Sequence, residues 1–178
     1  MEIHAYKIED SVPAPKFVII EKANDFVKTA NASINNRELS KSRAERLTFW
    51  NRFNEVLILK NKPFNVRKAT TDHYYDVALG TSEAHISITL VNKINSIGIE
   101  VYINDNKEMF DKLYSGAEAI HDELGFTLEW QRLDNKKAAR IIYYISGLDF
   151  NNHENYDELI YEVIDKVIVI RDSFRDRL

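Results

Sequence analysis

The stretch AHISITLVNKINSIGIEVYI, residues 84–103, decides the fold class. On both sides of the polar segment NKINS, apolar and polar residues alternate with the period of two that is typical of a strand with one buried face. The apolar positions are Ala84, Ile86, Ile88 and Leu90, then Ile97, Ile99, Val101 and Ile103. The short polar connection predicts an antiparallel hairpin.

The second face of this hairpin is polar. In any register that pairs the two apolar faces, the polar faces also pair, because successive side chains point to opposite sides. We therefore expect five side chains to share one open side of the sheet: His85, Ser87, Thr89, Glu100 and Tyr102. Such a face is either a binding surface or an ordinary solvated surface.

Helical patterns flank these strands. The first helix is predicted from Glu38 or Ser40 to about Leu59, because apolar residues gather on one of its sides. The members of this stripe are Leu39, Phe49, Trp50, Phe53, Val56 and Leu57. The second helix is predicted over residues 107–124, with Asp105 or Asn106 as its N-cap and Gly125 at its end. The last helix is predicted over residues 156–175.

Three more strands complete the pattern. YYDVALG (74–80) alternates in the same way, and residues 127–133 and 138–145 form a second hairpin. The order α-βββ-α-ββ-α predicts an α+β fold, with an antiparallel sheet of about five strands and three helices mostly on one face. A doubly wound parallel sheet is not expected, because strands and helices do not alternate along the chain.

The N-terminal residues differ from the rest. Two strand-like runs, 3–8 and 17–21, flank the proline pair in DSVPAPKF (10–17), which is typical of an extended connector. We expect residues 1–34 to form an extended arm or linker and residues 35–178 to form a single domain.

The composition excludes several classes of protein. The chain has 178 residues, of which 44% are hydrophobic and 29% charged, which is typical of a globular domain. The absence of cysteine excludes a disulfide scaffold, a thiolate metal site and a cysteine nucleophile. No signal peptide or membrane-spanning stretch is recognisable. We expect a cytoplasmic, bacterial-type protein without a membrane partner.

Positive charge is concentrated in one segment of an acidic chain. The net charge is −4, yet residues 37–68 contain nine Lys/Arg and three Glu, a net of +6. Such asymmetry can orient a polyanion. The turn and strand at 136–140 supply three candidate phosphate contacts and the first helix four more: Lys136, Lys137, Arg140, Arg37, Lys41, Arg43 and Arg52. The alternative is that the lysines of this hairpin tip serve only solubility.

No constellation of catalytic residues is recognisable. Asp105-Asn106-Lys107 and Asp134-Asn135-Lys136 match the short Asp-X-Lys motif of metal-dependent nucleases, with Asp76 as a possible upstream acid. Both triplets lie in polar turns, where Asp and Asn are favoured for local hydrogen bonding. The five histidines are scattered, and no phosphate-binding glycine loop occurs. We expect no catalytic residue, no metal site, no cofactor and no enzymatic activity.

Three stretches resemble a known family, the domain of unknown function 4268. They are AERLTFWNRFNEVL, DVALGTSEAHISITLVNKINSIGIEVYI and FDKLYSGAEAIHDELGFTLEWQRLDNKKAARIIYY, within residues 37–175. The recurrent features are Trp50, the strand around residues 98–100, the Leu-Glu-Trp at 128–130 and the turn and strand at 136–141. The family has no established activity, so the resemblance implies no catalytic residue.

The resemblance also implies a context. The segment YKIEDSVPAPKFVIIEKANDFVK (6–28) is similar to the linker that joins this domain to a preceding nuclease-like domain in longer family members. We expect a non-catalytic accessory domain that accompanies a nuclease-like module and contacts DNA or RNA. The alternative is a protein–protein or self-association domain, forming homo-oligomers through the open sheet face or the last helix. The third hypothesis is a divergent Mg-dependent nuclease.

Overall fold

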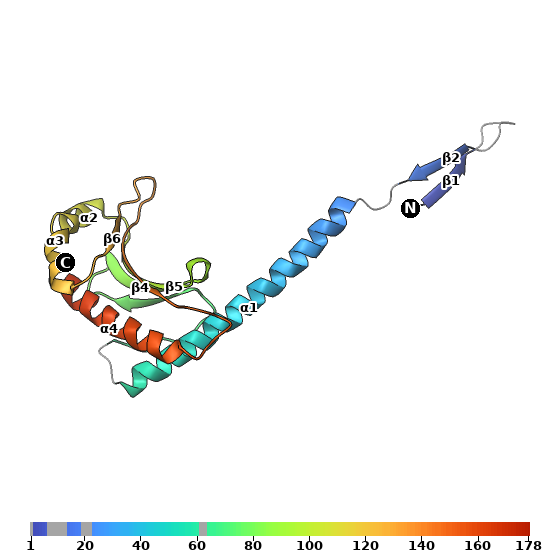
Figure 1. Cartoon of the computed structure of the whole chain (residues 1–178). Coiled ribbons are helices and arrows are strands. Elements are labelled where there is room, and N and C mark those ends of the chain that lie inside the picture. The colour runs from blue at the N-terminus through green and yellow to red at the C-terminus, as the bar shows by residue number, and fades with distance from the viewer. Residues whose placement is uncertain (1, 7–13, 19–22, 61–63) are drawn as a thin grey trace. The chain divides into compact units, whose positions relative to one another are not determined.

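A computed structural model describes residues 2–6, 14–18, 23–60 and 64–178 (Figure 1). The chain divides into two compact units, Met1–Ser42 and Arg43–Leu178. The first unit contains the antiparallel strands β1 (Glu2–Tyr6) and β2 (Ala14–Val18) and the first part of helix α1 (Ala23–Leu59). The second unit contains the rest of α1 and all other elements.

Helix α1 begins earlier than the sequence pattern predicts. Its 37 residues start at Ala23, so residues 23–34 are helical and the prediction of an extended arm is wrong for them. Residues 23–37 contain neither proline nor glycine, and nothing in them stops a helix from extending towards the N-terminus. The prediction relied on the apolar stripe, which begins only further along. Leu39, expected in that stripe, is 54% exposed.

The second unit is built on a five-stranded sheet in which every neighbouring pair is antiparallel. The strand order is β3 (Tyr74–Ala78), β4 (Ala84–Val91), β5 (Ser96–Ile103), β7 (Ala139–Ser146) and β6 (Glu129–Gln131). A 3₁₀ turn, η1 (Asn92–Ile94), and left-handed Asn95 connect β4 to β5. Ile88 lies opposite Ile99 in these strands, so the predicted antiparallel hairpin with paired apolar faces is confirmed.

The described residues contain four α-helices, where the sequence pattern predicts three. The predicted helix over 107–124 is divided into α2 (Lys107–Tyr114) and α3 (Ala117–Leu124). Ser115 and Gly116 separate them: the Ser115 hydroxyl donates to the Lys112 carbonyl, and glycine is a weak helix former. Gly125 ends α3 in a left-handed conformation, as expected. Helix α4 (Tyr156–Arg175) matches its prediction.

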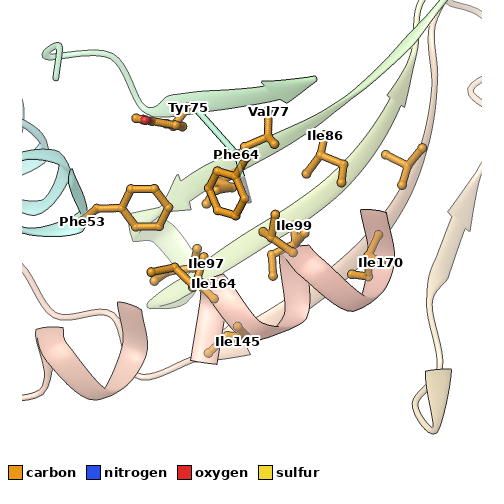
Figure 2. Packing of buried hydrophobic residues seen from close by; sticks show 14 of the residues in the cluster. Phe53, Phe64, Tyr75, Val77, Ile86, Ile97, Ile99, Ile145, Ile164 and Ile170 are labelled. Atoms are coloured by element: carbon orange, nitrogen blue, oxygen red, sulfur yellow. The ribbon is translucent and has the colours of Figure 1, made fainter. Parts of the chain in front are cut away.

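The four helices contribute to one core with the apolar face of the sheet. Figure 2 shows Ile97, Ile99 and Ile145 of the sheet next to Ile164 and Ile170 of α4. Figure 1 shows α4 running across the same side of the sheet. In the described part of the chain, no helix is both long and apolar enough to cross a membrane.

Trp50 anchors α1 in this core. Its side chain is fully buried, its Nε1 donates to the carbonyl of Asp72 at 2.9 Å, and its ring meets Phe49 and Phe53 edge to face. The hydrogen bond joins α1 to the segment before β3. Burial of the ring and satisfaction of its polar atom therefore occur together, which is the usual condition for a core tryptophan.

Replacing Trp50 by Phe should lower the free energy of unfolding by about 2–4 kcal/mol. The substitution leaves a cavity and removes the donor that pairs with the Asp72 carbonyl. Urea denaturation followed by circular dichroism measures this change. Leu59→Ala is the control, because Leu59 is 76% exposed and its loss should cost less than about 0.5 kcal/mol. Equal effects of the two substitutions would contradict the anchoring role of Trp50.

Candidate interaction surface

One side of the sheet carries no helix within the described residues of the second unit. We call this side the polar face. It consists of residues that share one direction in the register of β3, β4, β5 and β7: Tyr74, Asp76, His85, Ser87, Thr89, Gly98, Glu100, Tyr102, Arg140, Ile142 and Tyr144. None of these residues belongs to the core that the helices share with the sheet.

The centre of the polar face is a buried hydrogen-bond network. Thr89 Oγ1 donates to Glu100 Oε1 at 2.9 Å, and Arg140 Nη1 lies 3.5 Å from Glu100 Oε2. The hydroxyl of Ser87, also on β4, donates to Oδ1 of Asp76 on the neighbouring strand β3 at 2.9 Å. Glu100 is only 6% exposed. Because no described helix packs on this side, the side chains of the face themselves provide the cover.

Gly98 lets this network close. A methyl group at Gly98 would lie 2.6 Å from Thr89 Oγ1, 3.4 Å from the Tyr144 ring and 3.6 Å from Glu100 Oε1. Real Cβ atoms do not approach an oxygen to 2.6 Å. The missing side chain therefore leaves the space that Thr89, Glu100 and Tyr144 fill above β5.

Tyrosines and carboxylates give the polar face its character. Tyr74 and Tyr144 are 44% and 36% exposed, and the half-buried Tyr102 packs beside His85 with ring centres 5.2 Å apart. Burial raises the pKa of Tyr144, and the carboxylates of Glu129 and Glu100 raise it further. Its hydroxyl therefore keeps its proton and can donate a hydrogen bond at neutral pH.

The polar face has an acidic balance. Glu129 lies opposite Ile142 and so shares this direction of the sheet. Asp76, Glu100 and Glu129 are acidic and Arg140 is basic, so the four charges sum to −2. Arg140 Nε is also buried without a hydrogen-bond partner among the described residues. The face thus combines a net negative charge with one buried guanidinium nitrogen that no described residue pairs.

Several of the predicted phosphate contacts are paired with carboxylates inside the chain. Arg52 donates to both oxygens of Asp157 at 2.6 Å and to Glu55 at 2.7 Å, and it lowers the pKa of Asp157. Lys137 Nζ lies 3.0 Å from Asp105, and Arg140 faces Glu100. These pairs reduce the positive charge available to a phosphate backbone.

The predicted cations of the second unit also do not form one surface. Arg52 contacts the first turn of α4, whereas Lys137 contacts Asp105, whose neighbour Asn106 lines a pocket with Arg177 beyond the end of α4. Since α4 has 20 residues, the two sites lie roughly 30 Å apart. Of the remaining residues, Arg43 is exposed on α1 and Lys136 is exposed next to Lys137 in the β6–β7 loop, and Arg37 and Lys41 belong to the first unit.

The Asp-Asn-Lys triplet at 105–107 holds the β6–β7 hairpin to the start of α2. Lys107 Nζ donates to three carbonyls of the hairpin, those of Arg132, Leu133 and Ala138. Asn106 caps α2 by accepting from Met109 N at 2.8 Å. These contacts explain the 105–107 triplet as a structural element.

A second bridge fixes the same hairpin. Arg132 pairs with Asp134 and with Asp111 of α2, and it lowers the pKa of Asp111. Asp76 is far from this region, because β3 and β6 are the two opposite edges of the sheet, about four strand spacings or 19 Å apart. Among the described residues, no three His, Asp or Glu side chains are grouped as a metal site would require.

Sequence reasoning named five residues of the polar face and missed others. Tyr144 and Ile142 were not named, although Arg140 and the alternation in ARIIYYIS place both on the same side of β7. Arg140 was grouped with the loop lysines, yet it faces Glu100 in the sheet. Asp76 was interpreted as a possible acidic residue of a nuclease site, yet its carboxylate accepts a hydrogen bond from the Ser87 hydroxyl.

Comparison with known protein families identifies one family that matches the second unit. The family described as Domain of unknown function (DUF4268) matches residues 45–178, which is more than half of the chain. The chain belongs to this family. The DUF4268 match contains all five strands of the sheet, and with them the whole polar face. Searches among curated proteins and among solved structures gave no match.

Replacing Gly98 by Ala should destabilise the DUF4268 domain by about 1–3 kcal/mol. The new methyl group displaces the Thr89 hydroxyl and deprives buried Glu100 of that donor. Thermal or urea denaturation measures the loss. Gly116→Ala is the control, because only the Leu113 carbonyl, at 3.7 Å, lies near a methyl group there. A stable Gly98→Ala variant with unchanged amide signals for Thr89 and Glu100 would contradict this account.

Proposed function

We propose that this DUF4268 domain is a non-catalytic protein-interaction domain whose polar face binds a partner protein. The observation that carries the proposal is Glu100, a buried carboxylate at the centre of a sheet face that no described helix covers. On an ordinary solvated sheet face, charged side chains are exposed to water. A buried carboxylate loses this hydration, and hydrogen bonds must compensate for the loss. A preformed polar network with exposed tyrosines around it is suited to recognition.

The chemistry of the polar face favours a protein over a nucleic-acid backbone. Tyrosine and arginine are enriched at the centres of protein interfaces, because they combine large contact area with polar groups. The negative balance of the face repels phosphates and attracts cationic side chains. We therefore expect the partner to present Lys or Arg together with hydrogen-bonding groups.

The partner we propose is a nuclease-like module. The resemblance noted from the sequence implies that longer family members carry such a module before this domain. An accessory role fits the Asp-Asn-Lys triplet at 105–107, in which Lys107 holds the β6–β7 hairpin and Asn106 caps α2. The third hypothesis, a divergent nuclease, is less well supported for the same reason. The expected setting is the bacterial cytoplasm.

Substituting Tyr144 by Ser should weaken binding of the full chain to the isolated nuclease-like domain of a longer family member by about tenfold or more. The loss removes an exposed aromatic contact beside Glu100. Isothermal titration calorimetry measures the affinity. Tyr161→Ser is a matched control, since Tyr161 is 37% exposed but lies on α4, outside the polar face.

Two results would contradict this proposal. One is an equal effect of the two tyrosine substitutions, which would show that the polar face is not the contact. The other is the absence of binding in all variants together with a monomer in light scattering. A dimer that Tyr144→Ser converts to a monomer would identify a second copy of the chain as the partner, the self-association alternative.

Nucleic-acid contact is the second candidate, and the β6–β7 loop is the observation that favours it. Lys136 and Lys137 are exposed there, and Figure 1 shows the hairpin projecting from the rest of the sheet. Lys137 is 85% exposed despite its contact with Asp105, and such exposed pairs are weak. A phosphate backbone could therefore displace Asp105 from Lys137.

The double substitution Lys136→Glu/Lys137→Glu should abolish any gel shift of DNA or RNA at low salt. With two lysines in contact, the logarithm of the affinity should fall with the logarithm of salt with a slope of at most about −2. Lys93→Glu/Lys112→Glu is the control, because it makes the same charge change at two exposed lysines outside the hairpin. Unchanged nucleic-acid affinity in the hairpin variant would exclude this contact.

A further inference from the structure

A pocket of about 560 Å³ lies at the free edge of β3. Its walls come from four parts of the chain: the segment before β3 with Phe64 and Arg67, β3 itself, β4 with His85, and α4 with Arg171. Phe64 is 8% exposed and forms an apolar wall. Basic groups from distant positions in the sequence thus converge on one small space.

The backbone of β3 orients the two arginines. Arg67 Nη1 donates to the carbonyl of Asp76 at 3.1 Å, and Arg171 Nε donates to the carbonyl of Ala78 at 3.2 Å. Both planar forks are therefore held in place before any ligand binds, which reduces the entropy lost on binding.

One carboxylate lies among these cations. Asp76 Oδ2 is 3.5 Å from Arg67 Nη1, and Asp76 Oδ1 is 3.7 Å from His85 Nε2 and accepts the Ser87 hydroxyl. Asp76 is the single carboxylate among the described residues that line the pocket, against two arginines and one histidine. The lining charge is therefore +1 with neutral His85 and +2 with protonated His85.

The side chain of Arg67 remains accessible. It is 56% exposed, and its contacts with described residues are those with the carbonyl and carboxylate of Asp76, both made through Nη1. Its other nitrogens can therefore reach a ligand. A guanidinium fork matches the two oxygens of a carboxylate or phosphate, and such charge-assisted bonds are the stronger class.

We infer that this pocket is an anion site that accepts a phosphate or carboxylate group carried on an organic molecule. The preoriented arginines bind the anion, His85 adds a donor, and Phe64 contacts the apolar part of the molecule. The competing explanation is that the arginines only protect the edge of β3 from pairing with another strand. That role needs a hydrogen-bond donor, whereas an anion site needs the positive charge.

The substitution Arg67→Gln separates these two roles, because it retains a donor and removes the charge. We propose to titrate the full chain, labelled with ¹⁵N, with inorganic phosphate and separately with acetate in a buffer of low chloride. Saturable shifts of the β3 amides are expected, and Arg67→Gln should weaken binding about tenfold, the effect of losing one charge-assisted bond. Arg171→Gln should act in the same direction.

Arg175→Gln is the matched control. It removes the same charge from α4 one turn further along, at an exposed residue that does not line the pocket, and should change the affinity less than about twofold. Tighter binding of phosphate would identify a phosphoryl ligand, and tighter binding of acetate a carboxylate ligand.

Two results would overturn the inference. The first is the absence of saturable shifts with either anion up to roughly 50 mM, well above the concentration at which a two-arginine site should fill. The second is equal affinity in the Arg67→Gln, Arg171→Gln and unsubstituted chains. Tyr144→Ser should leave anion binding intact, so this inference and the proposed protein contact can fail independently.

Discussion

The pairing of β4 with β5 is the constraint on which the rest of the structure depends. Ile88 opposite Ile99 places every second residue of both strands against the helices, and a slip by one residue would bury the polar set and expose the apolar one. The same register brings Ser87 opposite Glu100 and Thr89 opposite Gly98. The core and the polar face are therefore one consequence of a single alignment, and neither can change without the other.

Burial of Glu100 distinguishes the polar face from a sheet face whose charged side chains are all exposed to water. A carboxylate that is 6% exposed must recover its lost hydration through the Thr89 hydroxyl and the Arg140 guanidinium. Glycine is unfavourable in the interior of a strand. At position 98 its missing side chain leaves room for the Thr89 hydroxyl to reach Glu100. Gly98 and Glu100, two locally unfavourable choices on one face of β5, are the basis for the proposal that this face binds a partner.

Much of the fold could be predicted because strand alternation and helix stripes are local signals. Residues 84–103 predict their own hairpin, and Phe49, Trp50 and Phe53 identify the buried part of α1. The start of α1 was missed because helix formation there is not accompanied by an apolar stripe. The break between α2 and α3 was missed because the apolar positions continue in register across Ser115 and Gly116.

The candidate site was harder to predict, because charge counts along a sequence ignore partners that folding supplies. Arg52 lies in a basic segment, yet its carboxylate partner Asp157 is 105 residues away. Lys137 and Arg140 meet Asp105 and Glu100 through contacts that are also distant in sequence. An excess of positive charge within a segment is thus compatible with an acidic surface in the folded domain.

The polar face and the pocket at β3 share Asp76 and His85, so the two regions are adjacent. The balance of charge changes from one region to the other. From β6 to β4 the face carries Glu129 and Glu100 against Arg140, a net charge of −1 with neutral His85, whereas at the edge of β3 two arginines exceed one carboxylate. A partner segment with a cationic group at one end and an anionic group at the other can align with this gradient in only one orientation. Charge of both signs at fixed positions therefore offers selectivity that neither region would provide alone.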